Sequence, residues 1–260
     1  MLTEPLFDVP AFLAFVLQAS STGGDGSWLA VPSGADCARM LLRWSHFVAG
    51  IVWIGILYFF NLVNVPLMKE LDGPTKGKVI PKLMPRALWY FRWGAVVTVF
   101  VGLAYYAMYL MPPDANAANA NVWSWLGLWL LIVVITWAII CALIHKVNDG
   151  RVLAVLVAIL TIVMSYLIIY FLKGNHTIAI GIGGGLGIIM LLNVWGIIWR
   201  AQKKIIAWTA DNAENGTPIP PESATLARRA LLASRTNAWL SLPMLLLMGV
   251  SHGDYIMFIK

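Results

Sequence analysis

The chain has 260 residues, of which 60% are hydrophobic and only 12% are charged, and its mean hydropathy is +0.78. Soluble domains carry about a quarter charged residues, so the composition excludes an ordinary soluble domain and predicts an integral membrane protein. The formal net charge of +6 is expected from basic cytoplasmic loops. We therefore expect contact with membrane lipid and no nucleic-acid partner.

Residues 1–36 are predicted to form a periplasmic or interfacial segment. The stretch PAFLAFVLQAS is too short to cross a bilayer before STGGDGS interrupts it, and no basic region precedes it. We expect a short helix that lies on the membrane surface. The rest of the chain, residues 37–260, is predicted to be a transmembrane bundle.

The fold class predicted for this bundle is all-α, a polytopic membrane helix bundle with about six spans. A bilayer core needs about 20 apolar residues per helix. Turn-forming sequences such as PPDANAANAN and VNDG separate the apolar segments. The six segments that qualify are approximately 38–66, 87–111, 122–146, 151–172, 176–199 and 236–258.

Lysine and arginine predict the orientation of the bundle. They concentrate in the loops that follow the first, third and fifth spans. Such loops are usually cytoplasmic, so we expect both termini on the periplasmic side of a bacterial inner membrane. The largest loop, residues 200–235, is a cytoplasmic segment that NGTPIPPES divides into two short helical stretches.

The first span carries an unusual polar stripe. On a helical wheel, its strongly polar side chains fall within about 60°, together with Gly50 and Trp53. An ionisable side chain inside a membrane is a candidate functional residue that faces the bundle interior. The polar residues of this stripe are Arg39, Arg43, His46, Asn61 and Asn64.

Depth distinguishes His46 and His252 from the other two histidines. With a rise of about 1.5 Å per residue, His46 and His252 each lie roughly 6 Å to the periplasmic side of the middle of their helix. His145 and His176 lie at span ends, and His176 is kept as a substitute ligand. Two imidazoles at one depth on antiparallel helices are the arrangement that axial ligation of haem b requires.

The neighbours of His46 also favour haem b as the cofactor. Gly50, one turn away, would let a flat ring approach the backbone, and Trp53 could pack against it. Arg43 and Arg39 lie one and two turns above His46, where they could bind propionate groups. The predicted metal ligands are therefore His46 and His252, and the cofactor-binding residues are Arg39, Arg43, Gly50 and Trp53.

Structural interpretations of these residues stay open. A membrane histidine can simply hydrogen-bond between helices, and the two arginines can extend to lipid headgroups.

The glycines of GIGGGLG are expected to allow close helix packing rather than nucleotide binding. Arg92 could reach Asn61 and Asn64. The sequence contains no HExxH motif and no Asp or Glu deep in a span, which disfavours hydrolysis and proton-coupled transport.

Three stretches, RWSHFVAGIVWIGILYFFN, MPRALWYFRWGAVVTVFVG and NAWLSLPMLLLMGVSH, resemble the membrane domain of bacterial cytochrome-c-linked urate hydroxylase, the membrane urate oxidase family. The resemblance covers most of the chain from about residue 38. It implies a helical membrane domain that passes electrons to a cytochrome c. The matching positions are Arg43, His46, Trp53, Gly55, Asn61, Arg92, Trp93 and His252.

Three functions follow as expectations. The first is a membrane haem-b redox protein that passes electrons between a small molecule or quinone and an external cytochrome c or partner chain. The second is urate hydroxylase, which converts urate to 5-hydroxyisourate, with a separate cytochrome c because the sequence contains no CxxCH motif. The third is a non-catalytic subunit of a larger membrane oxidase or respiratory complex.

Overall fold

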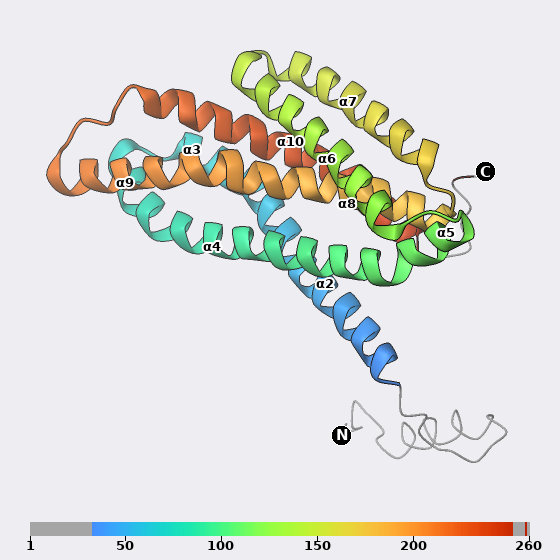
Figure 1. Ribbon diagram of the computed structural model, residues 1–260. Helices are drawn as coiled ribbons and strands as arrows, with labels where there is room; N and C mark the ends of the chain where they lie inside the picture. The colour runs from blue at the N-terminus through green and yellow to red at the C-terminus, as the bar shows by residue number, and fades with distance from the viewer. Residues whose placement is uncertain (1–32, 252–257, 259–260) are drawn as a thin grey trace, which may run out of the picture. The chain divides into compact units, whose positions relative to one another are not determined.

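The computed structural model describes residues 33–251 and Phe258 (Figure 1). The interfacial helix expected near the N-terminus and the predicted ligand His252 lie outside the described residues. The chain divides into two compact units, Met1–Leu41 and Leu42–Lys260. All of the packing and the site described below belong to the second unit, with the exception of Arg39.

The described chain is helical and contains no strand, which confirms the predicted fold class. Three π-helical segments, each five or six residues long, interrupt the α-helices. In chain order the elements are α2 (Gly34–Tyr58), η1 (Phe59–Asn64), α3 (Val65–Glu70), α4 (Gly73–Tyr105), η2 (Tyr106–Leu110), α5 (Met111–Ala117), α6 (Val122–Lys146), α7 (Gly150–Phe171), α8 (Asn175–Asn193), η3 (Val194–Ile198), α9 (Trp199–Asn215) and α10 (Glu222–Val250).

Five helical stretches of the described chain are long and apolar enough to cross a membrane: Gly34–Glu70, Gly73–Ala117, Val122–Lys146, Gly150–Phe171 and Asn175–Asn215. They contain the first five predicted spans. The sixth predicted span begins within α10, whose described part carries Arg229, Arg235, Asn237 and Ser241 and is less apolar. Its last residues include the undescribed positions 252–257. The protein is therefore a multi-pass helical membrane protein.

Helix α8 is the centre of the bundle, and α4, α6, α7 and α10 all pack against it. Its glycines make this possible. A Cβ atom on Gly183 would lie 3.3 Å from the Leu247 side chain, and one on Gly185 would lie 3.0 Å from Val133. Small residues let membrane helices approach closely where larger ones would hold them apart. The packing expected for GIGGGLG is therefore present.

The segment predicted as a cytoplasmic loop, residues 200–235, consists mainly of the end of the fifth spanning stretch and the first half of α10. Helix α8 continues through η3 into α9 as far as Asn215, and α10 begins at Glu222. Gly216 ends α9 in the left-handed conformation, with a φ of 72°, which glycine adopts without steric cost. Helices α9 and α10 pack against each other, and α4 packs along α9 (Figure 1).

Candidate functional site

A cavity of about 670 Å³ lies between helices α2, α4, α8 and α10. Ligand sites usually have volumes of about 300–1,000 Å³, with apolar walls and a few polar groups. This cavity fits that description, since aliphatic and aromatic side chains form most of its wall. Its polar side chains are those of Arg43, His46, Trp53, Tyr58, Thr98, Tyr105 and Tyr106.

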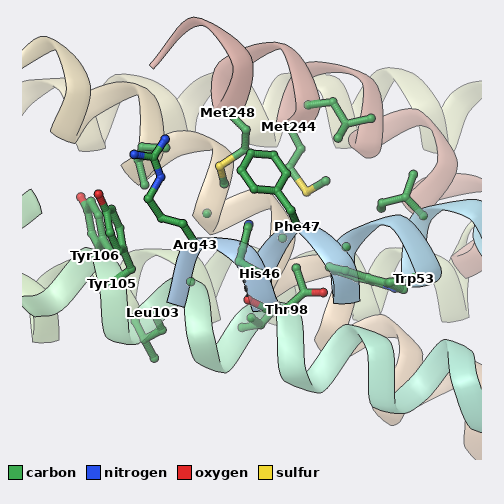
Figure 2. Close-up of a pocket in the computed structure, with 18 of the residues that line it drawn as sticks. Arg43, His46, Phe47, Trp53, Thr98, Leu103, Tyr105, Tyr106, Met244 and Met248 are labelled. Atoms are coloured by element: carbon green, nitrogen blue, oxygen red, sulfur yellow. Dashed lines mark hydrogen bonds between the residues drawn. The ribbon is translucent and has the colours of Figure 1, made fainter. Parts of the chain in front are cut away.

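The sequence predicted four of the wall residues, and they all come from α2. Arg43, His46, Gly50 and Trp53 line the cavity together, so the polar stripe does face the bundle interior over this part of the helix (Figure 2). Figure 2 shows Thr98 on α4 facing His46, and Met244 and Met248 on α10 across from Phe47.

His46 is held against α4. Its Nδ1 atom lies 2.8 Å from the main-chain carbonyl oxygen of Thr98. A carbonyl oxygen can only accept, so Nδ1 carries the proton in this bond, and in the neutral imidazole Nε2 is the acceptor nitrogen. Ligating histidines are commonly oriented by such a bond from the other ring nitrogen. The imidazole is therefore suited to bind a metal through Nε2.

Gly102 provides the space for this imidazole. A Cβ atom at position 102 would lie 2.8 Å from Nδ1 and Cε1 of His46 and 3.9 Å from Nε2. Any larger residue at position 102 would push the ring away from α4. Neither Thr98 nor Gly102 was identified from the sequence, because the hydrogen bond runs to the backbone and a glycine within an apolar span carries no distinctive signal.

The two arginines have different surroundings. Arg43 lines the cavity, and no side chain or main-chain acceptor in the described part of the chain binds its guanidinium group. Arg39 belongs to the first unit, and its Nη1 atom lies 3.7 Å from a carboxylate oxygen of Asp36. Arg43 is thus the cation available to an anionic group in this cavity.

Trp53 contributes an unused donor. The side chain is 1% exposed and lines the cavity, and its Nε1 atom has no hydrogen-bond partner among the described residues. Trp129, on another wall, differs because its Nε1 donates to the Gly181 carbonyl at 2.8 Å. A buried N–H without an acceptor costs free energy, so the Trp53 indole is held by packing rather than by a hydrogen bond among the described residues.

The other two histidines that the structure describes lie away from this cavity. His145 is exposed, and its Nδ1 lies 2.7 Å from the Cys141 carbonyl oxygen in its own helix. His176, at the start of α8, binds the Ser251 carbonyl oxygen through Nδ1 at 2.7 Å. Among the described residues, no group of three or more His, Cys, Asp or Glu side chains could hold a metal ion.

The end of α2 and the following η1 are joined to the middle of α10 by polar side chains. The Tyr58 hydroxyl lies 2.9 Å from Ser241 Oγ, and Asn61 Nδ2 donates to Ser234 Oγ at 2.9 Å. Ser241 itself donates to the Ala238 carbonyl, so Tyr58 is the donor of the first pair. These bonds hold the end of α2 and η1 against α10.

A second polar network joins α8 to α10. Asn193 Nδ2 donates to Asn237 Oδ1 at 2.8 Å, and Asn237 Nδ2 donates to the Met190 carbonyl at 2.9 Å. Trp137 Nε1 donates to Asn193 Oδ1 at 3.2 Å. Both asparagines are fully buried. This network holds the α8–α10 wall of the cavity in place.

Arg92 stacks on aromatic rings instead of reaching Asn61 and Asn64. Its guanidinium carbon lies 3.5 Å from the centre of the Trp199 ring and 5.3 Å from that of Trp195. Its Nε donates to the Leu88 carbonyl at 3.2 Å. Cation–π contacts of this kind stabilise a half-buried guanidinium group without a carboxylate.

The fold and the cavity together define a multi-pass helical membrane protein with a largely apolar, ligand-sized site. A family model described as urate oxidase N-terminal matches residues 73–258, which is more than two-thirds of the chain. The chain belongs to this family, and the match confirms the resemblance noted in the sequence. Helix α2, which carries Arg43 and His46, precedes the matched range. Comparison with curated proteins and with solved structures found no match.

Proposed function

We propose that the protein is a membrane redox protein that holds haem b in this cavity, with His46 as one axial ligand. The observation that carries the proposal is the bond from His46 Nδ1 to the Thr98 carbonyl inside an apolar cavity of about 670 Å³. That bond would orient the imidazole, with Nε2 as the nitrogen that binds the iron. The predicted second ligand is His252.

The residues around His46 fit such a group. Apolar walls suit a flat macrocycle, and Gly50 has room beside it, since a Cβ atom there would meet only Thr98, at 3.7 Å. Arg43 would pair with propionate carboxylates, because its guanidinium has no acceptor in the described part of the chain. The indole of Trp53 would pack against the ring.

When bound, haem b would supply one-electron transfer. The residues of this chain would set the conditions for that transfer. Thr98 would hold the orientation of His46, Arg43 would favour the reduced state through its positive charge, and the apolar wall would exclude water. We propose that the electrons pass to an external cytochrome c or another partner chain. The proposed location is a bacterial inner membrane, with both termini on the periplasmic side.

Urate hydroxylation, with a separate cytochrome c, is the second candidate. Membership of the urate oxidase N-terminal family favours it, and Arg43 could bind an anionic ring. A urate ring carries several N–H and C=O groups, each of which needs a partner when buried. The polar side chains of the cavity are few, so the walls suit haem better.

An absorption spectrum tests the proposal. Purified protein should show a Soret band and, after reduction, an α-band typical of haem b. Urate oxidation with added cytochrome c, measured by loss of urate and reduction of the cytochrome, would support the second candidate. A protein with neither haem nor turnover would contradict both and would leave the non-catalytic subunit.

A further inference from the structure

A second hollow lies between α2 and α4, at the surface of the bundle. It has a volume of about 320 Å³ and shares no lining residue with the cavity described above. The small residues Ser45, Ala49 and Gly94 line it and are only partly exposed, whereas the aromatic side chains around them are exposed. We call this hollow the outer groove.

A close contact between α2 and α4 lies beneath the outer groove. A Cβ atom on Gly94 would lie 3.3 Å from the main-chain nitrogen of Trp53 and 3.4 Å from the Ala49 carbonyl oxygen. Small residues of this kind let the backbones of two membrane helices approach closely. Larger side chains beside the contact form the sides of the groove. Trp44 of α2 and Trp93 of α4 are two of them, and they are 65% and 44% exposed.

The outer groove lies at hydrocarbon depth. The residues that line it belong to Gly34–Glu70 and Gly73–Ala117, which are long and apolar enough to cross a membrane. On α4 they occupy positions 89–97, inside the predicted span 87–111. Around such a span the surroundings are lipid chains rather than water. The part of any molecule that fills the groove must therefore be apolar.

Basic side chains continue the α4 side of the groove toward the start of that helix. Five side chains of α4 share one face, within about 80° on a helical wheel. They are Lys82, Arg86, Tyr90, Trp93 and Val97. The two basic residues are exposed, and neither forms an ion pair with a carboxylate in the described part of the chain. Helix α4 itself contains no Asp or Glu, so this end of the groove is positively charged.

We propose that the outer groove binds one acyl chain of a phospholipid with an anionic headgroup, and that Lys82 and Arg86 pair with that headgroup. With a rise of about 1.5 Å per residue, Arg86 lies roughly 12 Å from Gly94 along α4. The headgroup would therefore stay at the membrane surface while the chain passes Tyr90 and Trp93, since aromatic side chains favour this level. The inference goes beyond the redox proposal and does not depend on haem.

The shape of the groove favours a lipid over a second protein helix. An α-helix with its side chains is about 10–12 Å across, which is too wide to enter a groove of about 320 Å³. An unbranched hydrocarbon chain is narrow enough to lie over the small side chains of Ser45 and Ala49. It would gain contacts with the exposed aromatic rings on either side.

The charge at the end of the groove favours an anionic lipid over a zwitterionic one. Basic side chains next to a spanning helix attract anionic headgroups. A guanidinium group such as that of Arg86 can also bind a phosphate through paired hydrogen bonds. A phosphatidylcholine headgroup carries its own cation, so its net attraction to Lys82 and Arg86 is weaker.

Native mass spectrometry of the full chain in detergent tests the inference, because it reports bound lipids and the oligomeric state together. Phosphatidylglycerol should bind about tenfold more tightly than phosphatidylcholine with the same acyl chains. Lys82→Gln combined with Arg86→Gln should remove this preference. Lys203→Gln combined with Arg228→Gln is the matched control, since these exposed side chains of α9 and α10 carry the same charge and do not line the groove.

The groove needs its own variant. Val97 lines it and is 41% exposed, so Val97→Trp should fill the groove without disturbing the core. Binding of both lipids should weaken about tenfold, the effect of exposing two methylene groups. Val134→Trp is the control, because this valine of α6 is 43% exposed and lies outside the groove. Thermal unfolding of each variant checks the fold.

The results that would overturn the inference are distinct. Equal affinities of the unaltered protein for the two lipids would remove the role of charge, as would equal losses in the two double variants. Lipid binding that Val97→Trp leaves unchanged would remove the role of the groove. A dimer that Val97→Trp separates into monomers would make a second copy of the chain the occupant.

Discussion

The imidazole of His46 binds the main-chain carbonyl oxygen of Thr98 at 2.8 Å, although the two residues are 52 positions apart. The bond joins α2 to α4 and determines which ring nitrogen of the neutral imidazole is the acceptor. It therefore links the packing of two helices to the chemistry that their side chains can perform.

Replacement of His46 by alanine should abolish haem retention, because the proposed axial nitrogen is lost. His252→Ala should have the same effect if it is the second ligand. The haem-to-protein ratio of purified protein, measured by pyridine haemochrome, checks both. His145→Ala is the control, since this exposed histidine binds only a carbonyl of its own helix. Equal haem content in all three variants would contradict the ligand assignment.

Gly102→Ala should disturb the same ligand without touching the cofactor directly. The new methyl group would lie 2.8 Å from the His46 ring, so the imidazole must leave the Thr98 carbonyl. We expect lower haem content or an altered Soret position, measured against Gly127→Ala, where nothing lies within 4 Å. Identical spectra for the Gly102→Ala and Gly127→Ala proteins would show that the orientation of His46 does not affect the bound group.

Arg43→Leu should lower the midpoint potential of the bound haem or weaken its binding, and should leave the fold intact. A positive charge near the haem favours the form with one more electron, so its removal favours the oxidised form. Potentiometric titration measures the shift, and thermal unfolding in detergent checks the fold. Arg151→Leu, in an exposed position at the start of α7, is the control. A midpoint and a haem content that both stay unchanged would rule out the propionate role.

Asn237→Leu should destabilise the bundle by about 1 kcal/mol, because it leaves the Asn193 amide and the Met190 carbonyl without their partner. The melting temperature in detergent should fall. The exposed Asn116 provides the control, Asn116→Leu, which should melt near the unaltered protein. A melting temperature that rises in Asn237→Leu would mean that packing, not polarity, determines this interface.

Arg92→Met should cost about 1 kcal/mol through loss of the contact with Trp199. Arg92→Lys keeps the charge but not the planar group, so we expect an intermediate melting temperature. A double-mutant cycle with Trp199→Leu isolates the pair. Additive effects in that cycle would show that the stacking contributes nothing.

The family and the membrane-spanning character were both predictable from the sequence. Apolar stretches of sufficient length leave few alternatives to helices, because every backbone polar group in lipid must be bonded within its own segment. The inward stripe of α2 was predictable as far as Trp53, since a regular α-helix repeats every 3.6 residues. Arg43, His46, Gly50 and Trp53 accordingly line one cavity.

Beyond Tyr58 the helical wheel no longer predicts which side chains share a face, because the π-helical segment Phe59–Asn64 has a wider turn than an α-helix. Asn61 there binds Ser234, and the Oδ1 atom of the buried Asn64 has no partner among the described residues. The expected contact between these asparagines and Arg92 fails for a related reason. Aromatic faces can stabilise a cation as well as amides can. Only the packing of α4 against α9 decides that the Arg92 guanidinium contacts aromatic rings and not the asparagine amides.

The sequence by itself thus determined the membrane environment, the family and the inward face of α2, all of which follow from hydrophobicity and local periodicity. The tertiary structure alone decided that Thr98 and Gly102 position His46, and that the buried Trp53 Nε1 has no partner among the described residues. These features depend on which helices meet and how closely. The close approach at His46 depends on a single glycine, Gly102, and on the Thr98 carbonyl, which form no side-chain pattern that could be read in advance.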